Sequence, residues 1–466
     1  TDFIDNSGGV DCSDHEVNMK ILLNQVVAAG DLTEKQRNQL LEQMTEEVAD
    51  LVLLNNYRQT QALSIANHEA AHRLEEYRRL IVGLEAAGKL NRELEFLPDD
   101  EALEERKNAG KGLTRPELAV LIAYVKADLK QTLIDSELPD DPMLIAEMHK
   151  VFPGAMVQRF ASELQGHQLR REIIATQVAN DMVNHMGITF VDRLTNSTGA
   201  DPASIALAWI IAREVFRLNN WWGRIEQQDF RLPAELQIQL MNDLMRLIRR
   251  AVRWLLRNRR SELNIQNHLD RFTDNIGDIA GNLADFLGAG AEKEWKAQYQ
   301  KLEKLGVPGD LAAVVSGSSH LYSALGIIEV HESVGVPLKT VANLYFTLGE
   351  QLELNWFGNA IAALVPSSHW QALARESFRE DLHWQQRALT TGVLKMAENP
   401  GALETCVGLW MSQHEVMIAR WRSMLEELKA TREPEYAMFS VALRELLDLA
   451  QSTLHTPLSQ EDTASG

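Results

Sequence analysis

Four small or polar residues near the start of the chain have types and spacing that could serve chemistry: Asn6, Gly8, Gly9 and Ser13. The two glycines carry no Cβ, so a tight turn there could lie flat against a bound ring. Asn6 offers an amide donor and a carbonyl acceptor just before that turn. Ser13 precedes a helical pattern, where a hydroxyl and free backbone N–H groups could receive a carboxylate. An ordinary turn before a capped helix explains the same residues, so the pattern alone leaves both interpretations open.

The segment His68-Glu69-Ala70-Ala71-His72 matches the H-E-x-x-H pattern of zinc hydrolases. Histidines four residues apart on one helix can share a metal ion, with the glutamate as general base. Helix phase argues against this interpretation, because the apolar positions form a stripe that faces the other way. The stripe consists of Ala66, Ala70, Leu74, Tyr77, Ile81 and Leu84. We therefore place His68 and His72 on a solvated polar face, assign no metal site, and keep a zinc hydrolase as the least favoured alternative.

A basic stripe occupies one face of another predicted helix. It consists of Arg246, Arg249, Arg250, Arg253, Arg257 and Arg260. Such a stripe could bind nucleic acid, acidic lipid or an acidic protein surface. The chain has 66 acidic residues, however, so we interpret the stripe as an exposed or ion-paired helix face and assign it no partner.

The composition excludes several classes of protein. A formal net charge of −20 argues against a general binder of nucleic acid or of acidic membranes. The two cysteines, Cys12 and Cys406, lie far apart in sequence, which does not suit a disulfide framework and favours a reducing compartment. We find no run of 18 apolar residues that would predict a membrane span. We therefore expect a cytoplasmic globular protein with neither nucleic acid nor membrane as a partner.

Sequence patterns typical of helices occur through most of the chain, so helices must position the residues described above. Thr33–Gln36 and Thr114–Glu117 have capping-box spacing, and Asp201 precedes a proline at a first helical position. Between such junctions, apolar residues recur at i, i+3, i+4 and i+7. The best candidates for extended structure are Thr1–Ile4 and short pieces such as Ile188–Val191, and the polar segment Gly88–Gly112 is interpreted as a loop or a domain boundary. The predicted fold class is therefore mainly α and multi-helical.

Longer stretches of the sequence carry a family resemblance. The segment NSGGVDCSDHEVNMKILL resembles a hallmark of the large bacterial NAD-specific glutamate dehydrogenases. DLTEKQRNQLLEQMTEEVADLVLLNNYRQTQALS is similar to the same enzymes just beyond their dinucleotide-binding domain. LTRPELAVLIAYVK, FPGAMVQRF and HQLRREIIATQVANDMVNHMGITFVDRL continue the likeness, which covers essentially the whole chain. The resemblance implies the C-terminal region of a longer enzyme that converts L-glutamate, NAD and water to 2-oxoglutarate, ammonia and NADH.

The resemblance also implies roles for individual residues. The wider glutamate dehydrogenase family has an N-[AS]-G-G-V-x-x-S element, which residues 6 to 13 match. The match implies that Asn6, Gly8 and Gly9 lie at the NAD cofactor. It also implies that Val10 packs against the aliphatic chain of the substrate and that Ser13 hydrogen-bonds the γ-carboxylate. It places no catalytic residue here, because the family's proton-transfer lysines and aspartate come from a substrate domain.

The resemblance divides the chain as well. Residues 1–25 are expected to be a remnant of the dinucleotide-binding catalytic domain, and residues 26–112 a helical segment packed near it. Residues 113–456 are expected to form a helical C-terminal domain with an internal boundary near 288–310, followed by a flexible tail at 457–466. Because the sequence lacks a G-x-G-x-x-G phosphate turn and the proton-transfer residues, we expect this chain alone to be inactive and to serve a structural or regulatory role. From its apolar helix stripes we also expect a homo-oligomer. An independent helical scaffold is the alternative that composition alone would favour.

Overall fold

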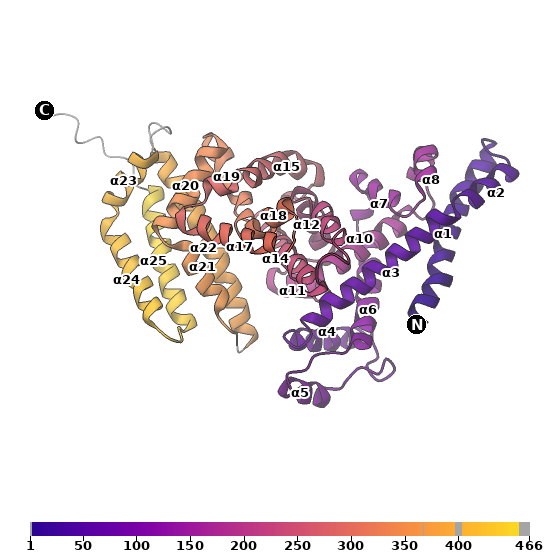
Figure 1. The fold of residues 1–466 in the computed structure, drawn as a ribbon, viewed down its shortest axis with the longest axis horizontal. Coiled ribbons are helices and arrows are strands. Elements are labelled where there is room, and N and C mark those ends of the chain that lie inside the picture. The colour runs from indigo at the N-terminus through magenta and orange to yellow at the C-terminus, as the bar shows by residue number, and fades with distance from the viewer. Residues whose placement is uncertain (1, 367, 397–402, 456–466) are drawn as a thin grey trace. The chain divides into compact units, whose positions relative to one another are not determined.

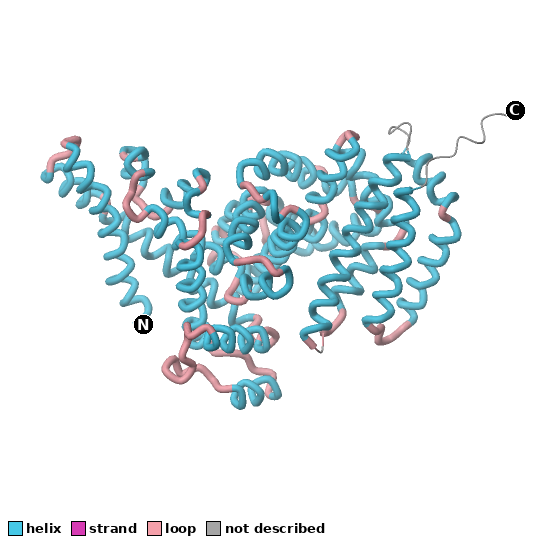
Figure 2. The backbone as a smooth tube through the Cα atoms, turned by 180° about the vertical axis from the view of Figure 1, so that it is seen from behind, coloured by secondary structure: helices cyan, strands magenta, loops and turns pink. Residues whose placement is uncertain are grey.

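The computed structural model describes residues 2–366, 368–396 and 403–455, and within these ranges it consists of helices and loops with no strand (Figures 1 and 2). The predicted mainly α, multi-helical fold class is confirmed. The chain divides into two compact units. The first unit comprises Thr1–Arg213 and Ile248–His268, and the second comprises Glu214–Leu247 and Leu269–Gly466. The predicted tail at 457–466 lies outside the described residues.

The first unit is built on the long helices α1, α3, α6 and α10, with shorter helices between them. Its elements are α1 (Asp2–Ala29), α2 (Glu34–Gln43), α3 (Thr45–His68), α4 (Leu74–Ala86), α5 (Asp100–Asn108), α6 (Arg115–Ile134), η1 (Leu138–Asp140), η2 (Pro142–Leu144), α7 (Ile145–His149), α8 (Gly154–Arg159), α9 (Ala161–Gln165), α10 (Arg170–Met186), α11 (Phe190–Thr198) and η3 (Arg260–Glu262). Helices α12 (Pro202–Val215), α14 (Ala234–Asn258) and α15 (Ile265–Gly281) contribute residues to both units.

Side-chain caps start several of these helices where the sequence predicts them. The backbone N–H of Gln36 donates to Thr33 Oγ1 at 3.3 Å, and the N–H of Thr114 donates to Glu117 Oε2 at 2.7 Å. Asp201 Oδ1 accepts the N–H of Ser204 at 2.9 Å at the start of α12. Each bond satisfies a backbone donor that the first turn of a helix leaves unpaired.

The start of the chain differs from its prediction. Helix α1 begins at Asp2, so the expected extended segment, the turn at Gly8-Gly9 and the helix start at Ser13 are wrong for this structure. Thr1 lies outside the described residues. Packing of the second half of α1 explains the difference, because its buried residues Met19, Leu22, Leu23 and Val26 anchor the helix. Once a helix is anchored, each further residue gains a hydrogen bond at little cost, which outweighs the weak helix propensity of glycine.

Two other segments also depart from their predicted structure. Ile188–Val191 was expected to be extended, but α11 begins at Phe190, directly after a turn in which Gly187 has a φ of 87°. The segment is apolar because Ile188 and Phe190 are both buried. A short buried run has the same apolar sequence pattern in a helix and in a strand. The predicted loop at Gly88–Gly112 contains helix α5, which Asp99 caps by accepting the N–H of Ala102 at 2.8 Å.

The core of the first unit lies between α6, α10 and α3, which pack against one another. Helix α6 buries Leu118, Leu121, Leu129 and Leu133 at this contact, and α10 buries Ile174, Val178 and Met182. The predicted apolar stripe from Ala66 to Leu84 is also buried, although α3 and α4 share it across a turn. Burial of such side chains is the main source of stability for helices of this kind.

The second unit is organised around the 28-residue helix α22. Its elements are α13 (Leu218–Glu226), α16 (Leu283–Phe286), α17 (Ala289–Lys304), α18 (Gly309–Leu321), α19 (Ala324–Val334), α20 (Leu338–Gln351), α21 (Leu354–Ala363), α22 (His369–Met396), α23 (Leu403–Gln413), α24 (Glu415–Ala430) and α25 (Tyr436–His455). Helix α22 packs against α19, α20, α21 and α25, and α24 packs on α25 (Figure 1).

Aromatic side chains anchor this packing. Phe357 of α21 lies 5.2 Å from Trp421 of α24 and 5.5 Å from Phe439 of α25, measured between ring centroids. The buried indole N–H of Trp421 has an acceptor, because it donates to the carbonyl of Leu352 at 2.9 Å. Such rings supply large buried areas, and the satisfied N–H avoids the cost of an unpaired polar group.

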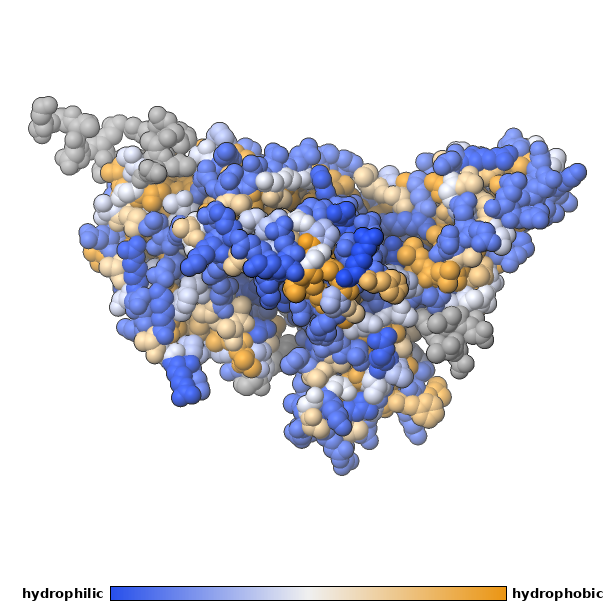
Figure 3. Space-filling model, in the orientation of Figure 1, coloured by the Kyte–Doolittle hydropathy of each residue, from blue (hydrophilic) through white to orange (hydrophobic). Residues whose placement is uncertain are grey.

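The outer surface carries both hydrophilic and hydrophobic residues. On the face shown in Figure 3, hydrophilic residues predominate and hydrophobic residues gather in separate groups. Within the described residues, no single helix is both long and apolar enough to cross a membrane. Helices α18 and α19 pass that test of length and composition only together, as a pair bent by 61°.

Close approach of α22 and α25 depends on Gly392. A Cβ at this position would lie 2.6 Å from Thr453 Cγ2 and 3.0 Å from the Thr453 carbonyl oxygen. Backbone atoms cannot move aside as the end of a flexible side chain can, so α22 and α25 would have to move apart. At Gly408 of α23, by contrast, a Cβ would meet no atom within 4 Å.

We predict that Gly392→Ala lowers the free energy of unfolding by about 1–3 kcal/mol, the usual cost of overpacking. Gly408→Ala is the matched control, and its better helix propensity should raise stability by about 0.5–1 kcal/mol. Urea denaturation followed by circular dichroism measures both changes. If the two substitutions shift the midpoint in the same direction, the close contact at Gly392 does not limit packing.

Candidate functional site

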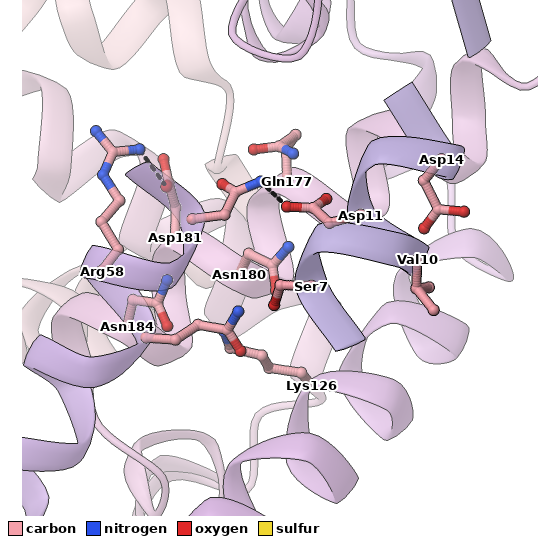
Figure 4. Close-up of a pocket in the computed structure, with 12 residues that line it drawn as sticks. Ser7, Val10, Asp11, Asp14, Arg58, Lys126, Gln177, Asn180, Asp181 and Asn184 are labelled. Atoms are coloured by element: carbon pink, nitrogen blue, oxygen red, sulfur yellow. Dashed lines mark hydrogen bonds and ion pairs between the residues drawn. The ribbon is translucent and has the colours of Figure 1, made fainter. Parts of the chain in front are cut away.

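A polar cavity of about 260 Å³ opens between α1, α3, α6 and α10 in the first unit (Figure 4). Charged and amide side chains form most of its wall. The lining residues are Ser7, Val10, Asp11, Asp14, Asn55, Arg58, Gln59, Lys126, Gln177, Asn180, Asp181 and Asn184. A wall of this composition suits a small polar molecule better than an apolar one.

A network of buried ions lies beside this cavity and includes Asp181 of its wall. Arg213 Nη2 lies 2.6 Å from Glu147 Oε1, and the two side chains are only 4% and 2% exposed. Lys150 Nζ bridges Glu147 Oε2 at 2.7 Å and Asp181 Oδ2 at 3.0 Å. Arg58 Nη1 approaches Asp181 Oδ1 at 4.0 Å from the cavity side. The network therefore connects α7, α10 and α12 with α3.

The network sets the charges at the cavity. Burial alone would raise the pKa of Asp181, but the neighbouring cations, led by Lys150, outweigh it and lower the pKa to about 2. Burial lowers the pKa of His185 to about 4, with the Asp181 charge acting in the opposite direction, so His185 is neutral at pH 7. Burial also lowers the pKa of Lys126 to about 8, again opposed by Asp181. At pH 7 the cavity wall thus holds an ionised Asp181 and a mostly protonated Lys126.

A second cavity of similar volume adjoins the first. The two share Asp11, Asp14, Asn55, Gln177 and Asn180. Asn55 Nδ2 donates to Asp11 Oδ2 at 3.0 Å, and this bond ties α3 to α1 at the boundary between the cavities. Polar groups from α1 are therefore part of both walls.

The structure brings only some of the sequence-predicted site residues to the cavity. Val10 lines it and is 54% exposed, whereas Ser13 is exposed and belongs to neither cavity wall. Gly8 and Gly9 are exposed on α1, and a Cβ at either would meet no atom within 4 Å. The backbone of Asn6 is helical, and its side chain lies outside what the structure describes. The assigned roles of these residues stay predictions.

The sequence analysis missed the cavity residues contributed by α3, α6 and α10. Arg58, Lys126, Asp181 and Asn184 are separated by up to 126 residues in sequence, and no known motif joins them. A usable signal exists in the second half of α10, where Asn180, Asp181, Asn184 and His185 interrupt an apolar run. Polar residues on the buried face of a helix require partners, which marks that face as a candidate site.

The H-E-x-x-H segment does not form one helical turn. Helix α3 ends at His68, and a turn separates it from α4, which begins at Leu74. Both His68 and His72 are exposed, as the helix phase predicts, and Glu69 pairs with Arg73 at 2.5 Å. Across the described residues, no group of three or more His, Cys, Asp or Glu side chains is placed to hold a metal ion. The geometry therefore gives no support to the zinc hydrolase alternative.

The predicted basic stripe lies on α14 except for Arg260, which belongs to η3 because α14 ends at Asn258. The stripe is partly paired within the chain. Arg253 Nη2 donates to Ser197 Oγ at 2.9 Å, and Arg260 lies 3.7 Å from Asp201. Arg246 pairs with Asp243, one turn earlier on the same helix. These contacts agree with an ion-paired helix face.

Comparison with known proteins identifies the family. The family model described as "Glutamate dehydrogenase, C-terminal" matches residues 110–448. The model described as "Bacterial NAD-glutamate dehydrogenase, catalytic domain" matches residues 1–66. The chain belongs to the glutamate dehydrogenase C-terminal family. The resemblance found in the sequence is therefore confirmed.

Individual relatives are similar over almost the whole chain. An NAD-specific glutamate dehydrogenase of Pseudomonas aeruginosa is 53% identical over 98% of this chain, and one of Halomonas elongata is 48% identical over 97%. One of Mycobacterium tuberculosis is 35% identical over 97% of the chain. The matched region is 28% of each of these relatives, so the chain spans little more than a quarter of their length.

We predict that Arg213→Met lowers the free energy of unfolding by about 3–5 kcal/mol, because Glu147 and Asp181 would keep their buried charges without their guanidinium partner. Arg78→Met provides the matched control. Arg78 forms a 3.2 Å pair with Asp100 at the surface, and the loss of such a pair costs at most about 1 kcal/mol. Equal midpoints for the two variants in urea denaturation would contradict a stabilising role for the buried network.

Proposed function

We propose that this chain is the C-terminal part of a longer NAD-dependent glutamate dehydrogenase. The complete enzyme would oxidise L-glutamate with NAD and water to 2-oxoglutarate, ammonia and NADH. One observation carries the proposal: a match to the catalytic domain of bacterial NAD-glutamate dehydrogenases at residues 1–66 precedes a match to their C-terminal region from residue 110. The names of the relatives, each an NAD-specific glutamate dehydrogenase, support the substrate and the cofactor.

Residues 6 to 13 would form one wall of the catalytic cleft. Val10 would pack against the aliphatic chain of glutamate, and the hydroxyl of Ser13 would donate to its γ-carboxylate. Asn6 would bind the nicotinamide carboxamide or its ribose, where Gly8 and Gly9 allow close approach of the backbone. The exposure of Val10 and Ser13 supports these roles, because both side chains are accessible to another domain or a ligand. The open space around both glycines leaves the backbone free to adopt a turn against a cofactor.

The helical remainder would support that wall. Residues 1–25 would belong to the catalytic domain, residues 26–112 would pack near it, and residues 113–456 would form the C-terminal domain with a boundary near 288–310. Helix α3, which follows the motif, is tied to α1 by the Asn55–Asp11 hydrogen bond and to α10 by Arg58 and Asp181. This packing gives a rigid base to the segment that carries the motif. We further propose a cytoplasmic location and a homo-oligomeric enzyme.

The proposal predicts that the 466-residue chain alone forms no NADH from glutamate and NAD. Its sequence contains no Gly-rich phosphate turn, and the proton-transfer residues would belong to another domain. Absorbance at the NADH band, with the complete enzyme at equal molarity as the positive control, measures this. Glutamate-dependent NADH formation by the purified chain would contradict this division of the enzyme.

In the complete enzyme, we predict that Ser13→Ala raises KM for glutamate by about 10- to 100-fold, the usual worth of a hydrogen bond to a charged group. The KM for NAD should change little, because Ser13 would contact only the substrate. Ser162→Ala, an exposed serine of α9, is the control and should leave both constants unchanged. An unaltered glutamate KM in the Ser13 variant would remove its assigned role.

A further inference from the structure

The polar cavity contains a lysine that has no partner in the described structure. Lys126 projects from α6 into the wall, and none of the described residues forms a hydrogen bond or an ion pair with its Nζ. The nearest influence on its charge is Asp181, which is already paired with Lys150 and Arg213. A half-buried ammonium group without a counter-ion is poorly solvated and therefore favours the binding of an anion.

Two further polar groups in the same wall lack partners. Asn184 is 9% exposed, and its buried Oδ1 accepts no hydrogen bond. The Nε of Arg58 is also buried and donates none. A buried polar atom without a partner is unfavourable, so this side of the cavity is polar and incompletely satisfied. Neither residue belongs to the sequence motif at residues 6 to 13.

The opposite wall carries negative charge. Asp11 and Asp14 line the cavity from α1, across from Arg58 and Asn184 (Figure 4). Gln177 and Asn180 of α10 add amide groups to the lining. The cavity therefore has a cationic side and an anionic side with hydrogen-bonding groups between them.

We propose that this cavity binds a small zwitterion, with its carboxylate at Lys126 and Arg58 and its ammonium group at Asp11 and Asp14. A molecule with both charges neutralises each side of the cavity, whereas a simple anion would add negative charge to a cavity whose other wall already carries Asp11 and Asp14. The volume of about 260 Å³ lies below the roughly 300–1,000 Å³ of drug-sized sites, which limits the ligand to a molecule smaller than a typical drug. The carboxylate end of this site, at Lys126 and Arg58, does not depend on the dehydrogenase assignment, whereas Asp11 belongs to the motif of residues 6 to 13.

Calorimetric titration of the 466-residue chain tests the proposal. The probes are glycine, β-alanine and γ-aminobutyrate, which differ in the spacing of their charges, together with propionate and propylamine, which carry one charge each. At least one zwitterion should bind, and at least tenfold more tightly than either single-charge probe. Absence of binding by all three zwitterions at 20 mM (a ceiling of about −2.3 kcal/mol), or equal binding by propionate, would overturn the proposal.

Two pairs of variants locate the charges of the ligand. Lys126→Met should weaken binding at least tenfold, whereas Lys130→Met, on the same helix and outside the cavity wall, should not change it. Asp11→Asn should weaken the binding of the zwitterion more than the binding of propionate. Asp50→Asn, at an exposed position of α3, is its control. Binding that survives Lys126→Met unchanged would overturn the assignment of the carboxylate.

Proton uptake gives a readout that a purely structural role of Lys126 would not produce. A bound carboxylate stabilises the protonated lysine, whose pKa is about 8 in the absence of ligand. Binding at pH 8 should therefore take up about half a proton, detected as a dependence of the binding heat on the ionisation enthalpy of the buffer. In Lys126→Met this dependence should vanish, and its persistence would count against the proposed contact.

Discussion

The buried pair of Arg213 and Glu147 is the constraint on which the first unit depends. Two charges at this depth are tolerated only when each has its partner in good geometry, so α7 and α12 must hold one fixed separation. Lys150 extends the same requirement to Asp181 of α10, which joins the core helix to the pair. Apolar packing of α6, α10 and α3 provides most of the stability, and the buried ions add the requirement that each keeps its partner.

The same ions give the adjacent cavity its character. Because Lys150 and Arg213 neutralise Asp181, Lys126 faces the cavity without a counter-ion in the described structure. Polar side chains that would cost stability in a closed core thus line a space open to a small molecule. The buried ion network and the candidate binding site therefore share residues.

The second unit depends on a different interaction. Long helices pack along one another around α22, with aromatic rings such as Phe357 and Trp421 filling the space between them. Gly392 permits α22 and α25 to approach where any Cβ would collide with backbone. Close packing of this kind tolerates neither larger nor smaller side chains, which suits a rigid support better than an active site.

Sequence by itself determined the helical fold class, the family and several helix starts. Helix periodicity and caps such as Thr33 and Asp201 are local properties, because they depend on neighbours within one turn. The motif at residues 6 to 13 identified the family because its order of residue types is specific. The conformation of that motif was not determined locally, because anchoring of α1 by its buried second half overrides the turn preference of two glycines.

Only the tertiary structure decided which polar residues meet. Arg58, Lys126 and Asp181 lie on three different helices, and each alone looks like an ordinary charged residue. Their convergence follows from the packing of α3, α6 and α10, and the burial that makes their charges consequential exists only after packing. A sequence pattern reports contacts within a helix, whereas a cavity is made by side chains that only long-range packing brings together.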